Sequence, residues 1–266
     1  MQLLAIIVTG CAKLVGVLVR WLAQIHMFLY GILPALLPPD RLGTLMRRYY
    51  DMSYEEAGTR IPLTAYSWSL EAWEERVLAQ HLSHPDTILI LGAGLGRESL
   101  ALAQRGYRVL ALDFAHGGLV IGTRHAASLN LPITFIQADF LTLPVQAASV
   151  GYILLSGVMY SAVPGRTRRQ EWLRSLRTCL VPGGKLVLNF VIAREPETAL
   201  TRSIRRCTGV ILSWPGTNQT YQDGDTCTNG HFMHVFRDEE ELRAEVAEAG
   251  ATLIELHWPD GYAVLS

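Results

Sequence analysis

The sequence from Thr87 to Asp113 reads TILILGAGLGRESLALAQRGYRVLALD, and this stretch decides the fold. Its first apolar run, 88–91, is continuous, as expected for a parallel strand that is covered on both faces. Glycines follow at every second position, where the absence of a Cβ lets the backbone turn sharply and approach a ligand. A helix over about 97–105 would point its free N–H groups back at this loop, and Gly106 would end it. The stretch therefore predicts a strand, a ligand-binding loop, a helix and a second strand.

An acid ends the second strand. Asp113 follows the apolar run 109–112, where a carboxylate can accept hydrogen bonds from both hydroxyls of a ribose. A dinucleotide site requires G-x-G-x-x-G, in which the third glycine opens the helix to a pyrophosphate. Arg97 occupies the place of that third glycine here. The segment therefore favours a nucleoside.

The pattern G-x-G-x-G followed by an acid resembles that of the class I S-adenosylmethionine-dependent methyltransferases, of the small-molecule type. Further landmarks of that family follow in order: Ala138-Asp139-Phe140 after the strand ITFIQ, an apolar strand over 150–156, and the turn LVPGGK before LVLNF. The resemblance covers roughly residues 65–266. It implies an α/β fold, a three-layer Rossmann-like sandwich whose mostly parallel seven-stranded sheet has an antiparallel last strand.

The chain end agrees with this fold. Residues 251–258 alternate towards strand, Pro259-Asp260-Gly261 predicts a turn, and 262–265 is strand again. Helices are expected over 117–129, 166–180 and 239–249, so strands and helices alternate as in an α/β sandwich. We expect three regions: an apolar helical segment at 1–40, a helical lid or linker at 41–80, and the methyltransferase domain at 81–266 with a lid insertion at about 195–236.

The resemblance also implies a cofactor, S-adenosyl-L-methionine. The glycine loop would contact its methionine part, Asp113 its ribose and Asp139 its adenine. The cofactor-binding residues expected in this way are Gly92, Ala93, Gly94, Gly96, Asp113, Phe114, Asp139, Phe140 and Ser156. The implied reaction is methyl transfer to oxygen, nitrogen or carbon of a small acceptor. A non-catalytic nucleoside-binding partner protein, another group transfer from the same sulfonium donor, and a nicotinamide-dependent oxidoreductase are the alternatives.

Three residues are candidates for catalysis. Tyr160 follows the fourth expected strand, near the predicted position of the methyl group; it either lines the pocket or packs beneath the next helix. His231 and His234 lie in the polar segment 217–236, and a histidine can take a proton from a hydroxyl or amine acceptor. Either histidine could instead be structural. The nearby Asp223 and these histidines fit no metal motif, so no metal is expected.

The segment from Met1 to Pro39 carries only Lys13 and Arg20 as formal charges. Thr9, Lys13, Gly16, Arg20 and Gln24 fall on one narrow stripe of a helix. Three arrangements remain open: a helix in the plane of a membrane interface, a membrane-spanning helix, or a helical hairpin packed on the protein or a second subunit. Membrane association is favoured, at the cytoplasmic face. A soluble cytoplasmic enzyme follows if the segment packs on the protein.

The composition of the chain limits the kinds of partner that are expected. The net charge of −1 over 266 residues gives no global attraction to nucleic acid, so no nucleic-acid partner is expected. The four cysteines have no metal-type spacing and indicate free thiols. Two groups of residues stay ambiguous: the aromatic residues between 49 and 73, which form a lid or core anchors, and the arginines at 166–174, which are expected on a solvated helix face. The acceptor and the oligomeric state do not follow from the sequence.

Overall fold

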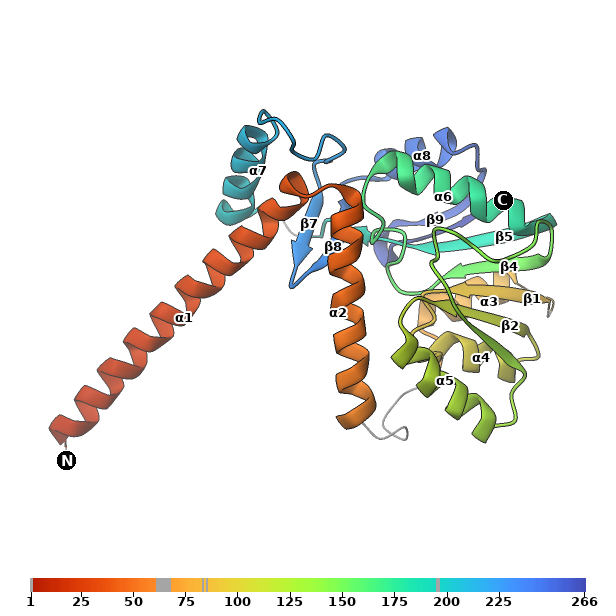
Figure 1. Ribbon diagram of the computed structural model, residues 1–266, viewed down its shortest axis with the longest axis horizontal. Coiled ribbons are helices and arrows are strands. Elements are labelled where there is room, and N and C mark those ends of the chain that lie inside the picture. Colours follow the sequence, from red (N-terminus) through yellow and green to blue (C-terminus); the bar gives the residue numbers. More distant parts are fainter. Residues whose placement is uncertain (1, 61–67, 83, 85, 195–196) are drawn as a thin grey trace.

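The computed structural model describes residues 2–60, 68–82, 84, 86–194 and 197–266 (Figure 1). The helices are α1 (Gln2–Leu36), α2 (Pro39–Arg60), α3 (Ala72–His81), α4 (Arg97–Gln104), α5 (His116–Ser128), α6 (Arg166–Cys179), α7 (Ala199–Ile211), α8 (Glu239–Glu248) and the short 3₁₀ helix η2 (Trp258–Asp260). The strands are β1 (Thr87–Leu91), β2 (Arg108–Asp113), β3 (Ile133–Gln137), β4 (Val150–Leu155), β5 (Leu180–Asn189), β6 (Val191–Ile192), β7 (Asp225–Thr228), β8 (His231–Phe236), β9 (Leu253–His257) and β10 (Tyr262–Leu265).

Seven strands form one sheet in the order β3-β2-β1-β4-β5-β10-β9. The pairs from β3 to β5 are parallel, whereas β10 runs antiparallel to both of its neighbours. This arrangement confirms the predicted fold, including the terminal hairpin. The order reverses at β1, because β2 and β4 lie on its two sides, and the carboxyl ends of parallel strands beside such a reversal form a crevice.

Helices cover both faces of the sheet (Figure 1). On one face, Leu89 and Leu91 of β1 pack in a core that includes residues of α6 and α8. On the other face, Ile88 and Ile90 pack against residues of α3 and α4. Successive strand residues point to opposite faces, so burial on both sides explains why this strand is apolar at every position.

The predicted polar insertion has regular structure. A helix, α7, is followed by the β7–β8 hairpin, and β6 joins β8 to give a second, three-stranded sheet. The segment 217–236, which was expected as part of a polar lid, also contributes buried residues to the interior. Asp225 and His234 are buried there, because they pair with each other and so satisfy their polar groups.

The amino-terminal segment is a single long helix, so the expected alternative of a hairpin is wrong. The end of α1 packs against α7 and β7, while its earlier part extends away from the domain (Figure 1). At the packed end Gly31 lies against Ile204, and the Asn218 side chain donates a hydrogen bond to the Pro34 carbonyl. Among the described residues, Val8–Leu36 is the one helical stretch long and apolar enough to cross a membrane.

Candidate functional site

The glycine loop lies where β1 ends. The backbone N–H groups of Gly92 and Ala93 both donate to the Leu112 carbonyl of β2, at 2.9 and 3.1 Å. Gly92, Gly94 and Gly96 have φ of 76°, 51° and 89°, a region that favours glycine. Gly96 also caps the amino terminus of α4. The loop therefore turns tightly at the strand ends and opens directly into a helix, as its spacing predicted.

Asp113 holds this loop in place. Its Oδ2 accepts from the Gly94 N–H and its Oδ1 from the Ala115 N–H, both at 2.8 Å. Burial raises the pKa of this carboxyl, against the lowering effect of these backbone hydrogen bonds. An ionised carboxylate offers about four acceptor positions, and two are used here. Asp113 can therefore still accept hydrogen bonds from a ribose.

Two side chains cover the glycines. The Tyr54 hydroxyl lies 2.6 Å from the position that a Cβ on Gly94 would take, and Met159 lies 2.7 Å from that of Gly92. Tyr54 comes from α2, which crosses the carboxyl edge of the sheet and contacts α5 and β8. The donor groups of the loop and Asp113 fit a nucleoside with an amino-acid tail, provided that Tyr54 and Met159 shift away from the loop.

The crevice continues on both sides of Phe114. A cavity of about 230 Å³ is lined by Gly92, Asp113, Ser156 and residues of α2. A second of about 320 Å³ is lined by Asp139 and Phe140, and Phe114 and Ala162 border both cavities. The Arg47 guanidinium lies over the Phe114 ring at 5.5 Å and forms an ion pair with Asp139. The structure thus brings Asp113 and Asp139 to one crevice on either side of an aromatic ring.

A third cavity, of about 780 Å³, begins at Gly157 and Val158, which also line the 230 Å³ cavity. Its wall is mixed: Trp73, Phe190 and the residues 191–193 are apolar, and charged side chains also line it, namely Glu71, Glu74, Arg97, Arg194 and Asp260. Trp73 is nearly buried and stacks on Tyr262, so it is both a core anchor and part of this wall. Three cavities therefore follow one another along the carboxyl edge of the sheet.

A buried carboxylate supports the middle of the crevice. The Ser156 hydroxyl donates to Glu98 at 2.5 Å, and Arg97 forms ion pairs with Glu98 and Glu74. Burial raises the pKa of Glu98, against the effect of Arg97. Sequence reasoning missed Glu98 and Glu74. The arginine at the third-glycine position was the available signal, because a buried guanidinium requires carboxylate partners.

His231 lies beside the crevice. Its Nε2 is 2.9 Å from the Tyr50 hydroxyl, and Tyr50 lines the 230 Å³ cavity. Burial lowers the pKa of His231, so the imidazole is neutral at pH 7. Burial, followed by the charges of Tyr49 and Asp113, raises the pKa of Tyr50 to about 12. The pair joins a neutral imidazole to a hydroxyl that faces the cavity.

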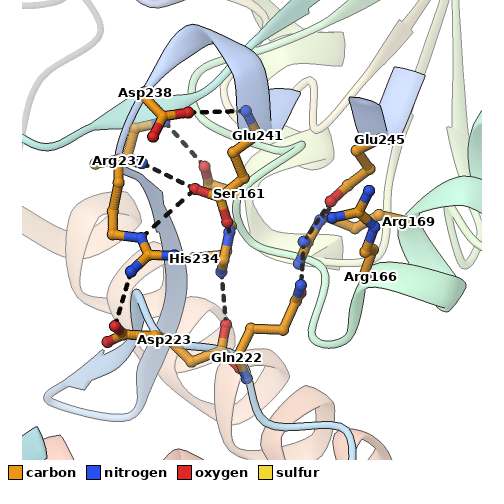
Figure 2. A network of polar contacts seen from close by, with 12 residues as sticks. Ser161, Arg166, Arg169, Gln222, Asp223, His234, Arg237, Asp238, Glu241 and Glu245 are labelled. Carbon is orange, nitrogen blue, oxygen red and sulfur yellow. Dashed lines mark hydrogen bonds and ion pairs between the residues drawn. The ribbon is translucent and has the colours of Figure 1, made fainter. Parts of the chain in front are cut away.

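His234 has a different environment. It is fully buried, with Nδ1 2.8 Å from Asp225 and Nε2 3.1 Å from Glu241 (Figure 2). Burial lowers its pKa, but the hydrogen bonds to the two carboxylates outweigh burial and the pKa is raised. The expectation that His234 faces an acceptor is therefore contradicted, because both ring nitrogens are occupied by structural partners.

Tyr160 is also a core residue. It is fully buried, its hydroxyl donates to Glu245 at 2.6 Å, and its ring stacks on Phe236. The interpretation of Tyr160 as a pocket residue is contradicted, since its side chain points into the core beneath α8. The expected solvated arginine face is wrong in part: Arg169 is fully buried and pairs with Glu245 (Figure 2). Among the residues that the structure describes, no group of three His, Cys, Asp or Glu side chains could hold a metal.

Comparison with known proteins agrees with this geometry. Residues 88–184 match a family described as "Methyltransferase domain", and they contain the glycine loop, Asp113 and Asp139. This matched region forms the parallel half of the sheet, and β10 completes it with the expected antiparallel strand. Residues 88–184 thus match a methyltransferase domain, and the fold around them is that of the class I S-adenosylmethionine-dependent methyltransferases. The resemblance predicted from sequence is confirmed.

Two curated relatives are similar to the methyltransferase domain. One is a demethylmenaquinone methyltransferase of Clavibacter sepedonicus, 36% identical over 39% of this chain and 40% of that protein. The other is a carboxy-S-adenosyl-L-methionine synthase of Pseudomonas putida, 31% identical over 42% of this chain and 49% of that protein. The chain therefore spans about half the length of the curated relatives it matches.

A solved structure is similar over more of the chain. It is a 1,6-didemethyltoxoflavin-N1-methyltransferase of Burkholderia thailandensis, crystallised with 1,6-didemethyltoxoflavin and S-adenosylhomocysteine. The similarity covers 86% of this chain and 88% of that one, with a TM-score of 0.60 and 18% identity. A [4+2]-cyclase, SpnF, is similar with a TM-score of 0.50 and 16% identity, over 69% of this chain and 57% of that one. The fold therefore does not by itself determine the reaction.

Proposed function

We propose that the chain binds S-adenosyl-L-methionine across the carboxyl edge of its sheet and transfers the methyl group to a small acceptor. One observation carries the proposal: the glycine loop and Asp113 border the middle of three successive cavities. A ligand in the two smaller cavities would have its ribose at Asp113 and its base beside Asp139. The third cavity, whose wall combines aromatic and apolar side chains with charged ones, would receive the acceptor.

Each part of the chain has a definite task in this proposal. When bound, S-adenosylmethionine supplies a methyl group that its sulfonium charge has already activated. The protein therefore contributes mainly alignment and exclusion of water. Asp113 orients the ribose, and the bare backbone of the glycine loop lets the donor approach the strand ends. Tyr54 and Met159 cover the loop and would close the site to solvent once they have shifted.

We assign the removal of the acceptor's proton to Tyr50 and His231. An acceptor hydroxyl or amine that loses a proton during transfer can pass it to Tyr50, whose own proton moves to the neutral His231. Tyr50 lines the middle cavity, whereas His231 does not, so the tyrosine would be the nearer of the two to an acceptor that reaches from the third cavity towards the methyl group. His231 is then a positioning and proton-accepting residue behind it.

A second function is favoured by the matches to carboxy-S-adenosyl-L-methionine synthases, which are 31% identical to parts of the chain. In that case the chain would modify the sulfonium nucleoside itself and release it, without methylating an acceptor. The same nucleoside crevice would serve both reactions. The two functions differ in the nucleoside product, which would be S-adenosylhomocysteine or a heavier sulfonium compound.

The decisive experiment has two steps. Calorimetry with S-adenosylhomocysteine and with NADH tests the site, and we expect binding of the first alone. Incubation with methyl-labelled S-adenosylmethionine and a panel of phenols, quinols and amines tests the reaction, with mass spectrometry of both products. Label in an acceptor supports methyl transfer, and a heavier nucleoside supports the second function. Binding of NADH in place of the homocysteine nucleoside would refute both.

A further inference from the structure

The free part of α1 is apolar around most of its circumference, and a narrow polar stripe runs along one side. Its exposed apolar residues include a continuous row at Leu14, Leu18, Leu22, Ile25 and Leu29, which are between 38% and 72% exposed. The spacing of four, four, three and four residues keeps them on one side of the helix. Val15 and Val19 widen this row, at 57% and 58% exposure. In water so large an apolar surface is unfavourable, so a partner is expected to cover it.

The polar side of α1 continues into its packing face. Lys13, Arg20 and Gln24 are followed by Gly31 and Ala35 at spacings of seven, four, seven and four residues, which again keep one side of a helix. Gly31 packs on Ile204 of α7, and the Ala35 carbonyl accepts from the Asn218 N–H. The domain therefore sits on the same side of α1 as the two cations, opposite the apolar row.

The charged residues within α1 and α7 are of one sign. Lys13 and Arg20 are exposed, and the described part of α1 from Val8 onward contains no acidic residue. On the adjoining α7, Arg202 and Arg206 are exposed on one row, and α7 also lacks acids. Cations beside an apolar surface match an interface whose headgroups are anionic.

From this register we infer that α1 lies in the plane of an anionic lipid interface, with the row Leu14–Leu29 in the acyl region and the methyltransferase domain on the water side. A helix in this orientation keeps Lys13 and Arg20 at headgroup level. A spanning helix would place Lys13 or Arg20 within the bilayer, at a cost of roughly 2.5–3.5 kcal/mol on the insertion scale. A spanning helix would also not require the polar stripe and the packing face to lie on the same side of α1.

The first test is flotation of the full chain with phosphatidylcholine vesicles, with and without phosphatidylglycerol. We expect binding that increases with the anionic lipid. Leu18→Glu should lower the vesicle-bound fraction at least about tenfold, because a buried leucine is replaced by a charge. Gln24→Glu adds the same charge on the opposite side and should leave most binding intact. Equal losses in the two variants, or no binding by the unaltered chain, would overturn the inference.

A labelling experiment tests which side of α1 faces the lipid. Cys11 lies on the apolar side and is exposed, so it serves as a natural probe in a Cys207→Ser background. With vesicles, an impermeant maleimide should fail to label Cys11 but should label a cysteine introduced by Gly16→Cys on the polar side. Protection of both positions would indicate a spanning helix, and protection of Cys11 without vesicles would indicate a second copy of the chain. Either result contradicts the in-plane arrangement.

Discussion

The Tyr50 hydroxyl lies 2.9 Å from Nε2 of His231, although 181 positions separate the two residues in the sequence. The contact joins α2 to the first residue of β8. It also connects the β7–β8 hairpin to the cavity beside the glycine loop. Tyr50 belongs to the aromatic group for which the sequence left a lid or a core role open, and here it lines the crevice.

If this pair moves the acceptor proton, Tyr50→Phe and His231→Gln should each lower kcat by roughly 10²–10⁴-fold. The affinity for S-adenosylhomocysteine should change little, because His231 lines none of the three cavities and Tyr50→Phe keeps the ring that lines the middle one. Since burial lowers the pKa of His231, the acid limb of the kcat profile should lie below the ordinary value of 6.5. His231→Gln should remove that limb. An unchanged profile in the variant would exclude a proton role.

Asp113→Asn should weaken binding of S-adenosylhomocysteine by roughly 1–3 kcal/mol, because the amide keeps the shape but loses acceptor capacity. Isothermal titration calorimetry measures this directly. Asp238→Asn is the matched control, since Asp238 caps α8 far from the crevice and accepts the Glu241 N–H. The control should keep full affinity. If Asp113→Asn bound the nucleoside as tightly as the unaltered chain, the assignment of Asp113 to the ribose would be wrong.

Gly94→Ala tests the close approach at the loop. The substitution adds a Cβ where φ is 51° and where the Tyr54 hydroxyl lies 2.6 Å away. Gly183→Ala adds the same group at φ 82° with nothing within 4 Å. Both should lose about 1–2 kcal/mol of unfolding free energy from backbone strain, measured by urea denaturation. Only Gly94→Ala should also weaken binding of the homocysteine nucleoside, and similar affinities in the two variants would contradict a role of the loop in binding.

The raised pKa of the buried His234 leads to a prediction of how folding stability depends on pH. In the folded protein the pKa of His234 lies above 6.5. Its contribution to folding stability is therefore fully present below pH 6.5 and is lost as the pH rises through the raised pKa. The carboxylate of Glu241 acts in the opposite direction, since its pKa lies below 4.5 and its contribution disappears as pH falls through that lowered value. The deficit of His234→Gln in urea unfolding should therefore be larger at about pH 5.5 than at about pH 8.

Arg169 and Glu245 form a fully buried ion pair, in contact with Tyr160 and Gln222. Glu245→Gln should cost roughly 3–5 kcal/mol of unfolding free energy, because it leaves the Arg169 charge without a full partner. The double variant Arg169→Met, Glu245→Leu should cost less than the single one, since no charge is then buried. Thermal and urea unfolding of the three proteins measure this. A double variant less stable than the single would show that the pair itself is a major stabilising interaction.

The fold could be predicted because its signals are local. The continuous apolar run 88–91, the alternating glycines and the terminal turn at Pro259 each depend on neighbours in the sequence. Their order then determines a parallel sheet with one antiparallel strand. The cofactor residues follow the same logic, since Asp113 ends β2 and Asp139 lies two residues beyond the end of β3, so both meet at one edge of the sheet.

The catalytic candidates could not be separated in this way. His231 and His234 are three residues apart on one strand and therefore point to opposite faces, but the sequence does not indicate which face meets the crevice. Their environments differ because Asp225 pairs with His234 across the hairpin and Glu241 approaches it from α8, while Tyr50 reaches His231 from α2. Likewise Tyr160 and Arg169 are buried through Glu245, a residue of a distant helix. Long-range partners decide such roles.

The position of β10 has a consequence for biosynthesis. This strand is inserted between β5 and β9, yet it follows both of them in the chain. During translation the parallel half of the sheet can form early, while the open backbone edge of β5 and its apolar neighbours wait for residues 253–265 to leave the ribosome. A nascent chain stalled before that point would expose a strand edge ready to pair with another chain, so productive folding depends on the last strand arriving before such an encounter.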